Sequence, residues 1–533
     1  MNKYIIKIAG LGLLALSLVS CNKFLSQSPD DRTQINDVEA AKELGVTAYI
    51  EYSFVPLFEF RSDNVVDKGT GFNVSSNKDP YMYLYEENVP STYQDSPQGV
   101  WRASYNAIAT ANQVLADLER TNATGEQADA TKGEMLIARA YAMYMLSQAF
   151  TVPYDPATAG TDLGLPYPTE PEEELIKKYE RGTLKELFEK ISKDFEEGYK
   201  LVGNTYKAPK FHFTRQAAAA FGTRLYRTLH NWDRVIELGN EVFGNDIYLY
   251  TRKINGAGSL YNGTYYERKQ VWGSETENCN LFLNVALSSW TRSIADRYAL
   301  NVTLRDHFRK VDSDVVSGDN FLGTAPAYSF FGREDWVNQP KIEEHFKVTN
   351  KATGTGFVYS QEVVLCGDEV LFNMAEAYAM KNNFQKTEEL LQVFVSNYML
   401  GYDPANQKFK VTKEKIVTYY QDKVGKNLPD IAHGIEVNSF NPSFQTTPDQ
   451  EMYLRACVDL KRLAFLHEGM RWLDNRQYRM DIVHNILSDG DSKEEFIVLR
   501  GNNPRYAYQL PANVLPYLEK NPGYDKELEK VSK

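Results

Sequence analysis

The sequence predicts an all-α, mainly helical fold, in which pairs of helices support a loop-rich, irregular region with little β structure. Apolar residues recur at the helical period of 3.6 residues over several stretches, most clearly between 101 and 153. One such pattern returns later in the chain with the same spacing. Two stretches, about 61–98 and 244–359, contain many aromatic residues and no helical period. These observations predict a repeated helical scaffold that carries long loops.

The stretch 101–153 is predicted to form two antiparallel helices. The first buries the face formed by Trp101, Tyr105, Ile108, Asn112, Leu115 and Leu118. The second buries the face formed by Ala138, Tyr141, Ala142, Met145 and Ala149. Its small alanines let a neighbouring helix approach closely, and it ends before Pro153 because the residue before a proline avoids the α region. Such a pair is a unit of the tetratricopeptide kind, which needs further copies to bury its outer face.

Further helices of this kind are predicted downstream, giving four tetratricopeptide-like pairs in one domain of residues 38–533. They cover about 184–243 and 362–400, with a last helix at 451–480 and a first helix near 38–58. The spacing of Tyr226, Asn231 and Trp232 returns in Tyr378, Asn383 and Phe384. This repetition indicates that the helix pairs belong to one scaffold.

The composition is that of a globular protein that does not bind nucleic acid. Of the 533 residues, 43% are hydrophobic and 24% are charged, and the formal net charge is −12. Nucleic-acid binding depends on Lys and Arg side chains that neutralise phosphates, and this chain has no long basic run. Aromatic residues make up 13%. Most of them are expected to fill the core, although so much Tyr and Trp also suits a surface that binds a flat, amphipathic ligand.

The N-terminus predicts an exported, lipid-anchored protein. Residues 1–20 contain two lysines around the start of an apolar run that is too short to span a bilayer but is typical of a secretory signal. The run ends in Leu-Val-Ser-Cys, a lipobox-like pattern that makes Cys21 the predicted lipidation site, at the start of a tether at 21–37. Acyl chains on this cysteine would bind outer-membrane lipid at about 0.8 kcal/mol per buried methylene. No later segment has about 18 consecutive apolar residues, so we expect a tethered chain.

Several sequence features occur in the order found in a known family. They are the lipobox-like segment, the Trp101 helix followed by Ala138-Arg139-Ala140-Tyr141, the alanine-rich helix at Arg215, Ala375-Glu376-Ala377, Glu468-Gly469-x-Arg471-Trp472-x-Asp474, and the ending Gln509-Leu510-Pro511 to Asn521-Pro522-Gly523-Tyr524. In this order, over nearly the whole chain, they resemble the SusD/RagB family of outer-membrane nutrient-binding lipoproteins.

The resemblance implies a location and a partner. Members of the family sit on the outer face of the outer membrane of Gram-negative bacteria, where they cap a SusC-like TonB-dependent transporter. Their ligand lies between this lid and the transporter barrel. It is usually an oligosaccharide, and in some relatives it is a peptide. The resemblance therefore implies a glycan-binding lipoprotein that delivers its ligand to a transporter, with oligopeptide uptake as the alternative.

The chemistry of sugar binding selects candidate residues within the two loop regions, from which the family draws its site. A sugar ring packs its C–H groups on an aromatic face, and its hydroxyls need amide, carboxylate or guanidinium partners. The candidate ligand-binding residues are Trp290, Arg292, Trp336, Asn338, Tyr328, Asp63 and Tyr81. Each of them could instead be a core residue or a transporter contact.

Catalysis, cofactors and metals are not predicted. The chain lacks GxSxG, HExxH and Walker motifs, and it has no GxGxxG after a strand. A surface glycoside hydrolase stays open as a less favoured alternative, because 71 acidic residues always offer some suitable pair of carboxylates. Cys279, Cys366 and Cys457 follow no metal-binding or disulfide pattern and are expected to be small buried side chains.

The segment around Glu468 is predicted to be structural. In a helix, Glu468, Arg471 and Asp474 follow i, i+3 spacing, which favours an ion-paired cluster over a catalytic trio. A third class of function, a purely structural lipoprotein, would need no ligand site. It predicts that alanine at Trp290 or Trp336 lowers stability without a separate effect on ligand binding.

Overall fold

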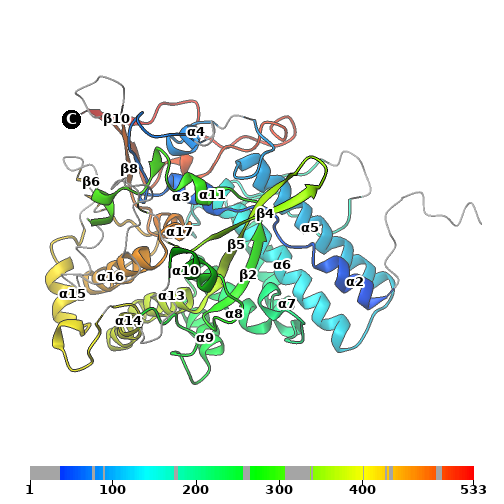
Figure 1. The fold of residues 1–533 in the computed structure, drawn as a ribbon, viewed down its shortest axis with the longest axis horizontal. Helices are drawn as coiled ribbons and strands as arrows, with labels where there is room; N and C mark the ends of the chain where they lie inside the picture. The colour runs from blue at the N-terminus through cyan, green and yellow to red at the C-terminus, as the bar shows by residue number, and fades with distance from the viewer. Residues whose placement is uncertain are drawn as a thin grey trace, which may run out of the picture.

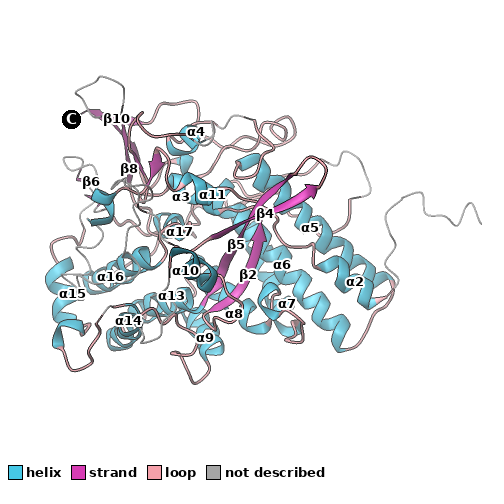
Figure 2. Ribbon diagram, in the orientation of Figure 1, coloured by secondary structure: helices cyan, strands magenta, loops and turns pink. Residues whose placement is uncertain are grey.

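The computed structural model describes residues 37–74, 79–87, 90–172, 178–255, 264–306, 337, 340–399, 401–425, 429–430, 436–437, 439–487 and 495–532. The predicted signal, the tether and Cys21 lie outside the described residues. Within these ranges the chain is mainly helical, with strands confined to small sheets (Figure 2). None of the described helices is both long enough and apolar enough to cross a membrane.

The predicted pair at 101–153 is confirmed as α5 (Pro97–Arg120) and α6 (Glu126–Phe150), which pack against each other. α5 begins at Pro97, four residues before the predicted apolar face begins at Trp101, because Ser96 caps the helix. The Ser96 Oγ accepts a hydrogen bond from the Gly99 N–H at 3.0 Å. α6 is buried along most of its length, because α7 (Leu184–Leu201) covers its other side. A Cβ at Gly198 would lie 2.8 Å from the Gly133 carbonyl, so glycine permits this close approach.

The repeated spacing of Tyr226 and Tyr378 marks two equivalent helix corners. The first joins α8 (Arg215–Thr228) to α9 (Trp232–Phe243), and the second joins α13 (Gly367–Met380) to α14 (Phe384–Tyr398). At each corner an asparagine caps the second helix and donates its backbone N–H to the tyrosine carbonyl at 2.9 Å. The residue before each asparagine has φ of 58°. The repeated sequence therefore encodes the same turn twice.

Three predicted helices have different bounds in the structure. The predicted first helix is divided into α2 (Val38–Gly45) and α3 (Val55–Arg61). The predicted last helix is divided into α16 (Pro448–Ala464) and α17 (Met470–Gln477). The break before α17 contains Gly469 with φ of 74°, a conformation that ends a helix. The stretch 362–366, predicted as helix, is the end of a strand.

Small antiparallel sheets occur both within the predicted loop regions and elsewhere in the chain. One has the strand order β2–β5–β4, formed by Asn280–Ala286, Thr355–Cys366 and Glu343–Asn350. Another has the order β10–β9–β8, formed by Glu529–Ser532, Glu495–Leu499 and Ile482–Ile486. Two-stranded pairs join β1 (Val66–Asp67) to β3 (Tyr298–Ala299), and β6 (Pro429–Asp430) to β7 (Glu436–Val437).

The elements form a long helical body with the sheets on one side of it. In Figure 1 the helices α15, α14, α13, α9, α8 and α7 follow one another along the lower side, and the β2–β5–β4 sheet lies against α8. The remaining short elements are α4 (Asp79–Tyr83), α10 (Tyr265–Trp272), α11 (Trp290–Ser293), α15 (Lys413–Tyr420), and the 3-10 turns Pro209–Phe211, Gln407–Phe409 and Pro504–Tyr506.

Buried arginines connect these layers. The Arg139 guanidinium of α6 binds Asp194 of α7 through two bonds of 2.6 and 2.8 Å, and Arg224 of α8 binds Glu369 of α13 through two bonds of 2.6 Å. Arg227, one turn after Arg224, contacts both α13 and α17. Arg139 and Arg224 each form two parallel hydrogen bonds with one carboxylate, and Arg227 is shared between two carboxylates. These geometries fix the orientation of one helix against another.

Candidate functional site

The structure brings the two predicted loop regions together. β1 pairs with β3, and the Arg297 guanidinium binds the Asp67 carboxylate through two bonds of 2.6 Å. Asp95 accepts hydrogen bonds from the Ser289 N–H and Oγ at 2.8 and 2.9 Å, which ties the segment 90–98 to the start of α11. Residues about 200 positions apart therefore build one surface next to the N-terminus of α5.

An open groove of about 730 Å³ lies between the segment 90–98 and the β4–β5 hairpin. It is lined by Tyr52, Pro90, Ser91, Thr92, Tyr93, Gln94, Gln98, Gly356, Phe357 and Val358. Tyr93 is 54% exposed and Phe357 is 52% exposed. The groove thus combines aromatic rings with hydroxyl and amide groups, and none of these lining side chains carries a formal charge.

Two arginines lie beside the groove. Arg102 of α5 is exposed, and its Nη2 donates to the Tyr52 hydroxyl at 2.7 Å and to the Thr92 carbonyl at 3.3 Å. Arg292 of α11 binds Glu344 of β4 through its Nε and Nη2, with a shortest distance of 2.6 Å. These hydrogen bonds to Glu344 raise the pKa of Arg292, and the nearby Tyr93 also raises it. Arg292 is therefore close enough to interact electrostatically with Tyr93, which lines the groove.

The predicted ligand-binding residues have different surroundings. Arg292 lies beside the groove, and Tyr81 of α4 is half-buried. Trp290 is 2% exposed: its indole N–H donates to the His467 carbonyl at 3.0 Å, and Phe60 packs edge-on at 5.3 Å. Asp63 is also buried. Trp336, Asn338 and Tyr328 lie outside the described residues.

Sequence reasoning missed several groove residues. Tyr93 and Gln98 were within the predicted loop at 61–98, but nothing in the local pattern distinguished them from other residues of that loop. Tyr52 and Arg102 precede and follow the loop, and Phe357 lies on a strand that the sequence did not predict. The sequence offered one signal for these residues, a polar and aromatic segment that begins at Pro90 and leads into a capped helix. Such a segment is typical of a loop that carries binding groups.

Comparison with known proteins agrees with this architecture. Residues 23–227 match a SusD-like family that is described as "Starch-binding associating with outer membrane". These residues make up less than half of the chain, and over them the chain is similar to the SusD-like family. No curated protein matches this SusD-like chain.

Solved structures show the same fold over almost the whole SusD-like chain. A SusD superfamily protein from Bacteroides thetaiotaomicron is 14% identical with a TM-score of 0.61, covering 91% of this chain and 99% of the other. A SusD-like carbohydrate binding protein from Bacteroides vulgatus is 13% identical with a TM-score of 0.60, covering 91% and 97%. A SusD superfamily protein from Bacteroides vulgatus is 15% identical with a TM-score of 0.62, covering 92% and 99%.

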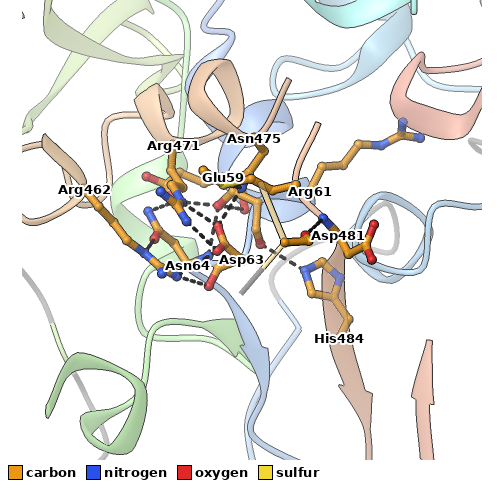
Figure 3. Close-up of polar contacts among 12 residues, drawn as sticks. Glu59, Arg61, Asp63, Asn64, Arg462, Arg471, Asn475, Asp481 and His484 are labelled. Atoms are coloured by element: carbon orange, nitrogen blue, oxygen red, sulfur yellow. Dashed lines mark hydrogen bonds and ion pairs between the residues drawn. The ribbon is translucent and has the colours of Figure 1, made fainter. Parts of the chain in front are cut away.

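Asp63 lies at the centre of a buried polar network of the SusD-like chain. Arg471 binds both carboxylate oxygens at 2.7 and 2.9 Å, Asn475 donates at 3.0 Å, and Arg462 lies at 3.3 Å. Figure 3 shows these side chains pointing toward one another between the end of α3 and the helices α16 and α17. Burial alone would raise the pKa of Asp63, but the two arginines hold it well below its usual range. In this position Asp63 joins two distant parts of the chain.

The predicted cluster of Glu468, Arg471 and Asp474 is structural, but the three residues do not pair with one another. Glu468 binds Lys341 at 2.7 Å, and Arg471 binds Asp63. Asp474 accepts from Arg227 at 2.8 Å and from Lys461 at 3.0 Å. The prediction of mutual pairs was wrong because α17 begins only at Met470, and its neighbours offer partners in better geometry.

Three buried groups in the SusD-like chain have donor atoms that a metal could use. The donor atoms of Cys279, Cys366 and Asp368 lie within 4.8 Å of one another. Asp368 already accepts hydrogen bonds from the Tyr398 hydroxyl at 2.6 Å and from the Cys279 thiol at 3.3 Å. These contacts account for the cluster without an ion. Cys457 is a buried free thiol, as the sequence predicted.

A smaller cavity of about 70 Å³ shares Tyr52 with the groove and contains a buried carboxyl group. Glu362 of β5 lines it and accepts a hydrogen bond from Ser360 at 3.1 Å. Burial raises the pKa of Glu362 to about 7, although hydrogen bonds from Ser53 and Ser360 act in the opposite direction. The Glu362 carboxyl group in this cavity is therefore held in its protonated form at mildly acidic pH.

Glu362 is expected to make stability depend on pH. Its pKa is raised on folding, so its contribution is complete below its unfolded value near 4.5 and is lost as pH rises toward about 7. Glu362→Gln keeps a neutral side chain at every pH. Between pH 5 and 8 we expect the unfolding free energy of the variant to rise relative to wild type by about 1 to 3 kcal/mol, measured by guanidinium unfolding. A pH-independent difference would show that Glu362 has an ordinary pKa.

Proposed function

We propose that this SusD-like chain captures oligosaccharides at the cell surface and delivers them to a SusC-like TonB-dependent transporter. The observation that carries this proposal is the open groove, where the exposed rings of Tyr93 and Phe357 stand beside uncharged hydroxyl and amide groups. Such rings pack against the C–H faces of sugars, while the polar groups bind hydroxyls. The family description and the carbohydrate-binding relative support a glycan ligand.

The proposal includes the anchor and the scaffold. Cys21 is the lipidation site that holds the protein on the outer membrane, facing the exterior, and residues 38–533 act as one domain. The helix pairs α5–α6, α8–α9 and α13–α14 are copies of a tetratricopeptide-like unit, which the two matching corners support. The proposed activity is the binding of oligosaccharide without catalysis. Among the predicted ligand residues, Arg292 and Tyr81 suit contact with ligand better than the buried Trp290 and Asp63.

The first test is a native affinity-gel screen of residues 22–533 against plant, host and microbial polysaccharides, followed by calorimetry with fragments of each hit. We expect retardation by at least one class of glycan, with an affinity on the order of micromolar to millimolar, because the groove is open. Binding of mixed oligopeptides alone would favour the peptide-uptake alternative. Release of shortened sugars from the substrate would favour a glycoside hydrolase.

Tyr93→Ala is expected to weaken glycan binding about tenfold without changing the thermal unfolding midpoint. The exposed ring of Tyr93 supplies an apolar face worth about 1 to 2 kcal/mol, and its loss exposes no core. Tyr517→Ala is the matched control, since Tyr517 is 57% exposed but does not line the groove. Equal affinity in wild type and Tyr93→Ala would place the ligand elsewhere.

A further inference from the structure

Arg102 differs from most of the described arginines, because no acidic partner for it lies among the residues that the structure describes. Its guanidinium is exposed and contacts two residues that line the groove, the Tyr52 hydroxyl and the Thr92 carbonyl. Both contacts are made by Nη2, and the ring of Tyr52 lies 5.6 Å from the guanidinium carbon. Among the described residues no carboxylate forms an ion pair with it. The arginine is therefore oriented by neutral groups, and its charge has no ion-pair partner in the part of the chain that the structure describes.

Two other charged side chains beside the groove, Arg292 and Asp95, already make hydrogen bonds. Arg292 forms its hydrogen bonds with Glu344, and Asp95 accepts two hydrogen bonds from Ser289. Among the described residues that line the groove there is no Asp, Glu, Lys or Arg. An anionic group entering the groove would meet the guanidinium of Arg102 at its edge, and none of the described lining residues is a carboxylate.

We propose that Arg102 makes the groove selective for glycans with anionic sugar units, whose charge is a uronate carboxylate or a sulfate ester. The inference rests on the proposed glycan-binding function and specifies its substrate class. Arg102 determines specificity by donating from Nε or Nη1, which make none of the hydrogen bonds that the structure gives this side chain. A single charge-assisted hydrogen bond from either nitrogen to a carboxylate or sulfate oxygen is stronger than a bond to a neutral hydroxyl.

The first experiment uses the wild-type protein and ligands that differ only in charge. Polygalacturonate is compared with its carboxyl-reduced form, and dextran sulfate with dextran, by calorimetry at low salt. A charge-assisted contact at an exposed site predicts about ten- to hundredfold tighter binding of the charged member of at least one pair. This preference should shrink as the ionic strength rises from about 0.05 to about 0.5 M, because salt screens exposed charges.

The second experiment assigns the preference to Arg102. Arg102→Gln should reduce the affinity for the charged ligand about ten- to hundredfold and leave binding of a neutral glycan within about twofold. Arg102→Lys should recover only part of the affinity. The control is Arg120→Gln, which removes the same charge from the same helix at a distance of roughly 27 Å. Circular dichroism and thermal unfolding check that every variant is folded.

The outcomes separate this inference from the proposed function. Preference for polygalacturonate identifies a carboxylate ligand, and preference for dextran sulfate identifies a sulfate ligand. Equal binding of the charged and neutral members overturns the selectivity but leaves glycan capture intact. A charge preference that survives in Arg102→Gln overturns the role of Arg102. Failure of every charged and neutral glycan to bind contradicts both the inference and the proposed function.

Discussion

Replacing Asp63 with alanine is expected to lower the free energy of unfolding by about 3 to 5 kcal/mol, even in the absence of ligand. The substitution leaves Arg471 buried without its bidentate carboxylate, and it also removes the acceptor of Asn475 and the neighbour of Arg462. An uncompensated buried guanidinium is far more costly than the loss of an exposed ion pair. The measurement is chemical unfolding at pH 7.

The control for this prediction is Glu389→Ala, which breaks an exposed pair with Lys386. We expect that variant to change stability by less than about 0.5 kcal/mol. Asp63 is also one of the residues that the sequence suggested for ligand binding. A stable Asp63→Ala protein that has lost only its affinity for glycan would support that role and contradict the structural role.

Trp290→Ala should cost about 3 to 5 kcal/mol of stability, as expected when a large buried aromatic side chain is truncated. The indole is 2% exposed, packs against Phe60, and donates its N–H to the His467 carbonyl. Its removal leaves a cavity and an unsatisfied carbonyl between α11 and the segment before α17. Thermal and chemical unfolding of the variant measure the loss.

Trp290→Phe separates the two contributions. It keeps a ring in the core and loses the hydrogen bond to His467, so we expect a smaller loss of about 1 to 2 kcal/mol. If Trp290→Ala proved as stable as wild type and failed to bind glycan, the ring would have to reach the ligand. That result would restore Trp290 as a ligand-binding residue.

Helix positions were predictable where the signal was local. The faces of α5 and α6 follow the helical period, and a helix satisfies its hydrogen bonds within a few residues of the chain. The corner motif at Asn231 recurs at Asn383 because a capping side chain and a single left-handed residue determine that turn. Gly469 was the signal in the sequence for a break before α17. The apolar residues on both sides of it continue the helical pattern, so the sequence predicted one helix there.

The candidate site was less predictable, because its residues are defined by partners far away in the chain. A tryptophan in an aperiodic stretch can line a groove or fill the core, and only the packing of Trp290 against Phe60 shows that it fills the core. Asp63 resembles any loop aspartate until Arg471 and Arg462 are placed around it. Tyr52, Arg102 and Phe357 become one surface only after the β4–β5 hairpin reaches the start of α5.

The sequence by itself determined the mainly helical scaffold and the family resemblance, and it predicted two loop regions that contribute to the candidate groove. These depend on periodicity, caps and motif order, which are properties of neighbouring residues. The tertiary structure decided which side chains face solvent, how the strands pair, and which charges remain uncompensated. Those properties depend on contacts between residues hundreds of positions apart, and a single sequence carries no local signal for such contacts.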